Sequence, residues 1–147
     1  ENHEQMGKWF KALDNIAKEN SQLEFILPLH PNPNVKRHKN LLKHINVVNP
    51  LPHPMLLDIL VKCKIIISDS GGLQEEGSFF NKKVIVCRKT TERPEGKASG
   101  HLTICKSPEE LCGIFNDLKD NYKIDKECPY GNGLSSLKIA KIINEGL

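Results

Sequence analysis

The sequence predicts an α/β fold, a Rossmann-like domain in which helices cover both faces of a parallel sheet and form three layers. Short apolar runs of strand length alternate with amphipathic stretches of helical length along the whole chain. Strands that are joined by helices pair in parallel. The 147 residues are close to the usual size of one domain, and no repeat, low-complexity tract or long linker divides them. We therefore expect residues 1–147 to form a single domain.

The expected elements follow one another in a regular order. A helix comes first, because apolar residues recur at helical spacing: Met6, Trp9, Phe10, Leu13, Ile16 and Ala17. Strand-like runs lie at 23–29, 45–49, 64–68, 84–87 and 101–105. Helical patterns separate these runs around 35–43, 54–62 and 73–80. Ser107, with Pro108 at the first helical position and Glu110 at the third, marks the start of another helix, and a final helix is expected after Gly133.

The composition argues against several classes of partner. The 21 basic and 18 acidic residues give a net charge of +3, and the basic residues are scattered among acidic ones rather than interleaved with aromatic ones. No apolar run approaches the roughly 20 residues that span a membrane. We therefore expect neither a nucleic acid nor a membrane as a partner, and we expect a cytoplasmic location.

The five cysteines are an odd number and show no CxxC spacing, which argues against both a zinc site and a disulfide framework. Cys63, Cys87 and Cys105 lie in or beside apolar runs, where a thiol behaves as a small hydrophobic group. We expect no metal and assign the cysteines no catalytic role.

The stretch from 64 to 95 combines two features of a site for a nucleoside diphosphate. The apolar run 64–68 leads into Ser70, Gly71 and Gly72, which lack bulk, and then into a helix. Small residues let backbone N–H groups approach an anion closely, and the helix directs its positive dipole end at the same point. Glu76 lies one turn into this helix, where a carboxylate can accept two hydrogen bonds from a ribose diol. A sugar nucleotide would satisfy both features.

Two further side chains are expected near this turn. Arg93 follows the next strand-like run, and a guanidinium can bind two phosphate or sugar oxygens at once. His30 follows the run 23–29, and the C-terminal ends of parallel strands meet at one sheet edge. Each feature also has a structural explanation. Glycine turns join strands to helices in many α/β domains, Arg93 could pair with Glu92 or Glu95, and a lone loop histidine usually has no role.

Four segments in one order carry a resemblance to a known family. They are PLHPNPNV at 28–35, SDSGGLQEE at 68–76, RKTTERPEG at 88–96 and PYGNG at 129–133. In these segments the chain resembles the UDP-N-acetylglucosamine 2-epimerases. Members of that family carry an HRxEN segment at the start of their second domain, whereas this chain opens with Glu1 and Asn2. The resemblance implies the C-terminal half of a two-domain GT-B-type fold, without its N-terminal domain.

The resemblance implies the interconversion of UDP-N-acetylglucosamine and UDP-N-acetylmannosamine, by elimination and re-addition of UDP, with no nicotinamide or metal cofactor. In relatives the carboxylates that move the C2 proton come chiefly from the N-terminal domain, so this half alone is expected to fold without turnover. A homodimer is expected for the full-length protein. The resemblance assigns UDP or substrate binding to His30, Ser70, Gly71, Gly72, Glu76 and Arg93, and Arg93 would also stabilise the departing diphosphate.

Two departures from the family pattern leave other activities open. The residues after the RPE triplet, at 96–99, differ from those of well-known members, and Asn132 replaces a common Asp. Both could reshape the sugar pocket. The alternatives are C2 epimerisation of a UDP-linked 6-deoxy-N-acetylhexosamine, hydrolytic release of N-acetylmannosamine, a GT-B glycosyltransferase that uses UDP-sugars, and an inactive UDP-sugar sensor. His53 stands where many relatives carry Tyr near the uracil, so its contact with the base is doubtful.

Overall fold

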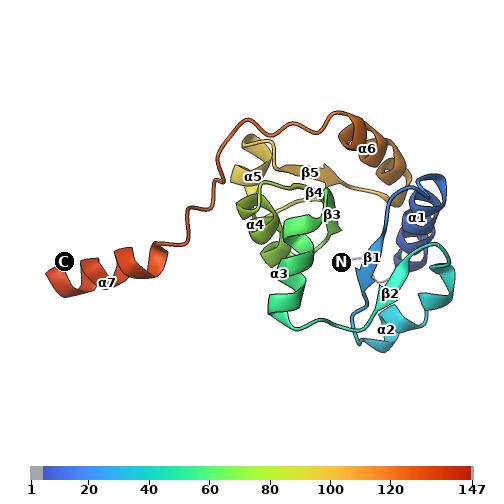
Figure 1. Ribbon diagram of the computed structural model, residues 1–147, viewed down its shortest axis with the longest axis horizontal. Coiled ribbons are helices and arrows are strands. Elements are labelled where there is room, and N and C mark those ends of the chain that lie inside the picture. Colours follow the sequence, from blue (N-terminus) through green and yellow to red (C-terminus); the bar gives the residue numbers. More distant parts are fainter. Residues whose placement is uncertain (1–4, 147) are drawn as a thin grey trace.

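Helices pack around two groups of parallel strands in the computed structural model, which describes residues 5–146 (Figure 1). One sheet pairs β1 (Ile26–Pro28) with β2 (Asn46–Val48). The other has the order β3 (Ile65–Ser68), β4 (Lys83–Cys87), β5 (Leu102–Cys105). All these pairings are parallel, so the predicted α/β class is confirmed. Glu1 and Asn2, which we compare with the end of the HRxEN segment, lie outside the described residues.

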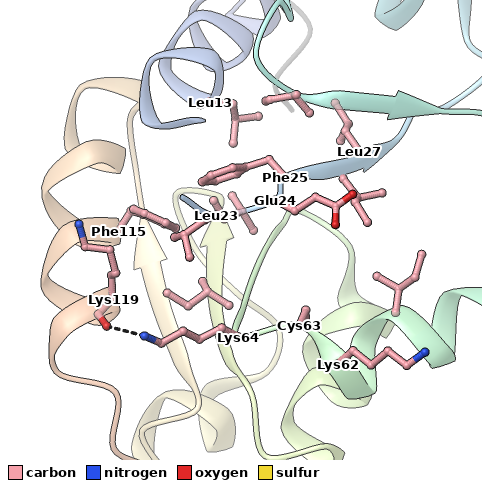
Figure 2. A pocket seen from close by; sticks show the side chains of 15 residues that line it. Leu13, Leu23, Glu24, Phe25, Leu27, Lys62, Cys63, Lys64, Phe115 and Lys119 are labelled. Carbon is pink, nitrogen blue, oxygen red and sulfur yellow. Dashed lines mark hydrogen bonds between the residues drawn. The ribbon is translucent and has the colours of Figure 1, made fainter. Parts of the chain in front are cut away.

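The strands are divided between two sheets, whereas the sequence predicts one. Within residues 5–146, β1 and β3 share no ladder of hydrogen bonds. Apolar side chains from both sides, including Phe25 and Ile65, line a cavity of about 450 Å³ between them (Figure 2). β1 is also shorter than the run 23–29, and it ends at Pro28, which has no N–H to donate.

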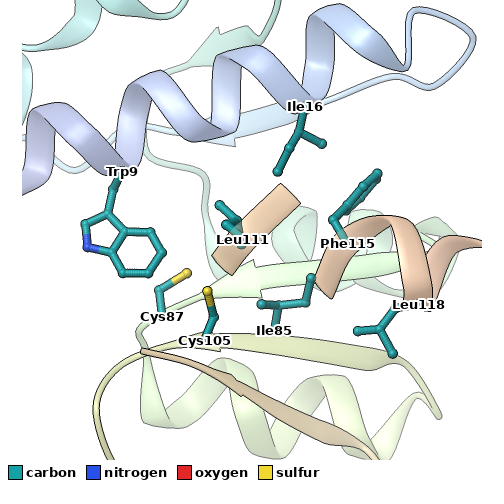
Figure 3. Packing of buried hydrophobic residues seen from close by; sticks show 8 residues of the cluster. All are labelled: Trp9, Ile16, Ile85, Cys87, Cys105, Leu111, Phe115 and Leu118. Carbon is teal, nitrogen blue, oxygen red and sulfur yellow. The ribbon is translucent and has the colours of Figure 1, made fainter. Parts of the chain in front are cut away.

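The core lies on both faces of β4, whose side chains at 84–87 are all buried. Successive side chains along a strand point to opposite faces. Ile85 and Cys87 pack beneath α1 (Met6–Glu19) and α6 (Pro108–Asp120), as Figure 3 shows. Val84 and Val86 pack on the other face, against side chains of α3 (His53–Lys62) and α4 (Gly71–Phe79). This arrangement supplies the helix, sheet and helix layers that the sequence predicts.

The two core cysteines behave as small apolar groups. Cys87 and Cys105 lie opposite each other on β4 and β5 and point into the cluster around Trp9 (Figure 3). Burial raises the pKa of Cys105 to about 11 and also raises the pKa of Cys87. Both are therefore neutral thiols at physiological pH.

Three short helices depart from the predicted pattern. α2 (Pro33–Lys36) and the 3-10 helix η1 (Lys39–Leu41) stand where the sequence predicts one helix at 35–43. α5 (Pro94–Ala98) is not predicted, because five residues are too few to show helical periodicity. Arg93, one of the predicted site residues, immediately precedes its first turn.

The last helix, α7 (Ser135–Glu145), extends away from the rest of the molecule (Figure 1). It confirms the helix expected after Gly133. Four apolar side chains on it are more than half exposed: Leu137, Ile139, Ile142 and Ile143. None of the helices described for residues 5–146 is long and apolar enough to cross a membrane.

Candidate functional site

The turn between β3 and α4 presents backbone donors at the C-terminal edge of the sheet. Ser70 is the N-cap residue, with extended backbone, and the Gln74 N–H donates to its carbonyl oxygen over 3.3 Å. The Ser70 N–H donates to Ser68 Oγ over 3.0 Å. In the first turn of a helix the N–H groups have no helical acceptor. The donors at the open end of α4 are therefore those of residues 71–73, while the Ser70 N–H is already paired.

Gly71 and Gly72 differ in what an added side chain would meet at each position. A Cβ on Gly71 would lie 2.6 Å from Glu92 Oε1, so the end of this half-exposed side chain would have to move to admit it. A Cβ on Gly72 would find nothing closer than Ser70 Oγ at 3.9 Å. The packing of this chain therefore does not require glycine at position 72, whereas close approach of an anion to the backbone would.

A buried glutamine holds the loop after β4 against this turn. Gln74 is fully buried, and its Nε2 donates to the Ser70 carbonyl oxygen over 3.3 Å. Thr91 Oγ1 donates to Gln74 Oε1 over 2.6 Å and accepts from the Arg93 N–H over 3.1 Å. This chain of hydrogen bonds fixes Arg93 relative to Ser70. We did not single out Gln74 or Thr91 from the sequence, although both lie inside the two motifs.

Arg93 lies beside the start of α4, as predicted, and is paired with carboxylates. Its Nη2 would be 3.8 Å from a Cβ on Gly71. Its Nε donates to Glu75 Oε1, and its Nη1 lies 3.9 Å from Glu92 Oε1. The hydrogen bond to Glu75 raises the pKa of Arg93. The alternative interpretation of Arg93 is an ion pair with Glu92 or Glu95. Its short contact is instead with Glu75, which lies one turn after Gly71 on α4.

Glu92 completes a small network of charges at this edge. Its Oε2 accepts from Arg88 Nη1 over 2.8 Å. A hydrogen bond from its own backbone N–H lowers the pKa of Glu92, and the charges of Arg88 and Arg93 lower it further. The loop therefore holds two guanidinium groups close to the turn, each in contact with a carboxylate.

Glu76 contacts a histidine at the start of α3. Its Oε1 lies 2.7 Å from Nε2 of His53, the first residue of α3. The Glu76 side chain is 31% exposed, so it can reach a ligand at the surface.

His30 follows β1 and is exposed. Its Nδ1 accepts from the Asn32 N–H over 3.2 Å. No hydrogen bond or ion pair described for residues 5–146 joins His30 to the turn at 70–72, to Glu76 or to Arg93. The structure thus places Arg93 beside the turn at 70–72, leaves Glu76 on the same helix in contact with α3, and places His30 at the end of the other sheet.

The PYGNG segment at 129–133 contacts the backbone of Arg93. Tyr130 Oη donates to the Arg93 carbonyl oxygen over 3.3 Å. A Cβ on Gly96 would lie 2.2 Å from the same Tyr130 oxygen. Asn132 is exposed, and its Oδ1 accepts from the Leu134 N–H over 3.3 Å. Tyr130 therefore supports the start of α5, a role that sequence reasoning did not assign.

Two hollows elsewhere among residues 5–146 include none of the predicted site residues: the cavity between the sheets and a hollow lined by polar residues such as Asn81, Asp125 and Glu127. The cavity between the sheets is lined mainly by apolar side chains, and its polar residues include Lys62 and Lys64 (Figure 2). None of the six predicted site residues lines it. Among residues 5–146, no three His, Cys, Asp or Glu side chains are grouped so that they could hold a metal ion.

Comparison with known proteins decides the family. The model of the family described as UDP-N-acetylglucosamine 2-epimerase matches residues 1–144. The chain belongs to the UDP-N-acetylglucosamine 2-epimerase family. The resemblance drawn from the four segments is therefore confirmed.

Individual members of the UDP-N-acetylglucosamine 2-epimerase family agree in sequence and in structure. A Campylobacter jejuni UDP-N-acetylglucosamine 2-epimerase is 34% identical over 92% of this chain. The Neisseria meningitidis enzyme, solved bound to UDP-N-acetylglucosamine, superposes with a TM-score of 0.91 at 31% identity over 99% of this chain. A Methanocaldococcus jannaschii enzyme in complex with UDP-N-acetylglucosamine and UDP gives 0.76 at 25% identity over 95% of this chain.

The chain spans about two fifths of these epimerases, namely 38%, 42% and 41% of their lengths. The predicted fold, one half of a GT-B-type architecture, is confirmed by the structural matches.

Proposed function

We propose that this chain is the UDP-binding half of a non-hydrolysing UDP-N-acetylglucosamine 2-epimerase, an isomerase that inverts C2 of a UDP-N-acetylhexosamine. The observation that carries the proposal is the meeting of the open first turn of α4 with the Arg93 guanidinium. Backbone N–H groups and a guanidinium are the two donors that best suit a diphosphate, and here Arg93 Nη2 would lie 3.8 Å from a Cβ on Gly71. The Neisseria meningitidis relative, solved with UDP-N-acetylglucosamine, supports this ligand class.

Each residue has a role in the proposed complex. The N–H groups of Gly71 and Gly72 and the guanidinium of Arg93 bind the diphosphate. The Ser70 hydroxyl, which does not cap α4, adds a donor at the same place. Glu76 accepts hydrogen bonds from the ribose hydroxyls, and His30 contacts the ligand from the end of β1.

The reaction places the greatest demand on the diphosphate contacts. When the C2 proton is removed, the electrons of the C2–H bond form a C1–C2 double bond, and the electrons of the C1–O bond leave with UDP. Negative charge then grows on the diphosphate, where the donors of α4 and Arg93 stabilise it. Re-addition of UDP after protonation of C2 on the other face gives the epimer. The base and acid that move the proton are proposed to lie in a preceding domain.

The organisation of the whole protein belongs to the same proposal. Residues 1–147 act as one C-terminal domain, and the active site forms in the cleft between it and an N-terminal domain. The full-length protein is proposed to be a homodimer. The family match favours epimerisation over the glycosyltransferase alternative.

The substitution Gly72→Ala tests the proposal. The added Cβ meets no atom closer than 3.9 Å in the chain, so the fold should keep its stability. It would stand between the backbone N–H groups and a phosphate, and UDP affinity should fall about tenfold to a hundredfold, the size of one lost hydrogen bond to a charged group. Uridine, which carries no phosphate, should be unaffected in the same calorimetric titration.

Gly113→Ala is the matched control, because a Cβ on Gly113 of α6 meets nothing within 4 Å and Gly113 lies away from the turn. It should leave UDP affinity unchanged. An unchanged UDP affinity in the Gly72→Ala variant would contradict phosphate binding at this turn.

A further inference from the structure

The contact between His53 and Glu76 joins two helices, α3 and α4, that are separated in the sequence by β3. His53 begins α3, which precedes β3, and Glu76 lies in the second turn of α4, which follows β3. The two side chains meet with 2.7 Å between Nε2 and Oε1. No other hydrogen bond or ion pair of the Glu76 side chain is described in residues 5–146. His53 is therefore the residue that fixes this carboxylate.

The backbone around His53 is unusually restricted. Pro52 is the N-cap residue of α3, and Pro54 is its second helical residue. Each proline ring fixes its own φ angle, which limits how the start of the helix can move. The Leu56 N–H donates to the Pro52 carbonyl oxygen over 3.1 Å and closes the first turn. The imidazole is thus held on a rigid base, although it is itself 63% exposed.

We infer that His53 is a positioning residue for ribose recognition, which donates from Nε2–H to Glu76 Oε1 and thereby holds the carboxylate ready for the ribose diol. This inference rests on the proposed function, in which Glu76 binds the ribose. A free glutamate samples several rotamers, and it loses that freedom when it binds a ligand. An imidazole that already holds Oε1 removes part of this loss before binding, and it leaves Oε2 for the hydroxyl groups.

The inference separates the role of His53 from direct contact with the base. A side chain that contacts uracil would contribute equally to UDP and to its 2′,3′-dideoxy analogue. A side chain that acts through Glu76 contributes only where the ribose hydroxyls are present. The same reasoning makes the effect of His53 depend on Glu76 itself.

The test measures the affinities of UDP and 2′,3′-dideoxy-UDP by calorimetry for the chain and five variants, one of them the double variant His53→Ala with Glu76→Gln. His53→Ala should weaken UDP binding by about threefold to tenfold, the usual cost of ordering one side chain on binding, and leave dideoxy-UDP unchanged. His53→Gln, whose amide can also donate, should restore most of the loss. In the Glu76→Gln background, His53→Ala should have no further effect on UDP. Val61→Ala, an exposed position in the last turn of α3, is the control and should change neither affinity.

Failure of the inference and failure of the proposed function give different results. If Glu76→Gln weakens UDP but His53→Ala does not, the positioning role is overturned and Glu76 keeps its role. Equal losses for UDP and dideoxy-UDP on His53→Ala would also overturn it, since His53 would then act on another part of the ligand or on the fold. If the parent chain binds both nucleotides equally well and Glu76→Gln has no effect, ribose recognition by Glu76 fails, and the inference fails with it.

Discussion

Arg93 is ordered by its neighbours at the backbone and at the side chain. Its N–H donates to Thr91 Oγ1, its carbonyl oxygen accepts from Tyr130 Oη, and its guanidinium contacts Glu75. Fixing a free arginine side chain costs up to about 2 kcal/mol of conformational free energy. Because these contacts already order the side chain, a diphosphate would bind with less of that cost.

Arg93→Ala should therefore separate charge recognition from structure. If Arg93 contacts the diphosphate, UDP affinity should fall by about 1.5–3 kcal/mol, the size of a hydrogen bond to a charged group, and uridine affinity should change little. The loss should shrink as salt rises, since salt screens exposed charges. Calorimetric titrations with both ligands at two salt concentrations measure this. Equal losses for UDP and uridine would assign Arg93 to the fold alone.

Local chemistry explains which site residues the sequence could predict. Ser70 and Gly72 stand in a strand-to-helix turn, whose position follows from the apolar run before it and the helical pattern after it. The choice of Glu75 rather than Glu92 as the close partner of Arg93 depends on how α4 and α5 pack, and no local pattern encodes it. The same holds for Gln74, whose burial only the folded chain reveals.

At the scale of elements, α5 is the small helix that sets the position of Arg93. Gly96 of α5 packs against Tyr130, the side chain that supports this helix. A Cβ on Gly96 would stand 2.2 Å from Tyr130 Oη and 2.6 Å from Leu102. Gly96→Ala should therefore destabilise the fold by about 1–3 kcal/mol, as overpacking usually does. Urea unfolding measures the change.

Gly113→Ala on α6 is the matched control for this substitution. A Cβ there meets nothing within 4 Å, and alanine favours a helix, so the variant should gain about 0.5–1 kcal/mol. If Gly96→Ala is as stable as the parent chain, Tyr130 does not brace α5 as described.

Asp14 ties α1 to the segment before β2. Its Oδ1 accepts from the N–H groups of Lys43 and His44 over 2.6 and 2.7 Å, and its Oδ2 lies 2.9 Å from His44 Nδ1. Burial acts to raise the pKa of Asp14, but these hydrogen bonds outweigh it and leave the pKa below its ordinary value of 3.8. A lowered pKa stabilises the fold above the ordinary value, and this stabilisation is lost as pH falls through the folded-state value.

The parent chain should therefore lose more stability than Asp14→Asn as pH falls from about 5 to about 2. At neutral pH the variant should be less stable, because a neutral amide accepts weaker hydrogen bonds than a carboxylate. Urea unfolding of both proteins across this range gives the comparison. Parallel losses of stability in the two proteins would show that the Asp14 carboxylate has no part in acid unfolding.

At the scale of the whole molecule, α1 joins the two sheets. Phe10 packs with Leu29 and Leu42 beside the first sheet, while Trp9 and Ile16 pack on the second (Figure 3). The division into two sheets could not be predicted, because the apolar runs at 23–29 and 64–68, which contain β1 and β3, fit a continuous sheet as well as two neighbouring ones. The order of strands and helices could be predicted, since periodicity along the chain decides it.

The 147-residue chain should fold cooperatively but should not turn over UDP-N-acetylglucosamine. Its core is complete on both faces of β4, whereas the groups proposed to move the C2 proton belong to another domain. NMR of the sugar anomeric signals after prolonged incubation should show substrate alone. Accumulation of the N-acetylmannosamine epimer would contradict the need for a cleft between two domains.

The central claim is that the open turn of α4 binds the diphosphate of UDP, and amide NMR shifts of the labelled chain test it most directly. Titration with UDP should move the amide signals of Gly71, Gly72 and Leu73 strongly, whereas uridine at equal occupancy should leave them nearly unmoved. Inorganic pyrophosphate should move the same three signals. If UDP leaves these amides unchanged, or moves instead those of residues that line the cavity, such as Phe25 and Ile65, the proposed site is wrong.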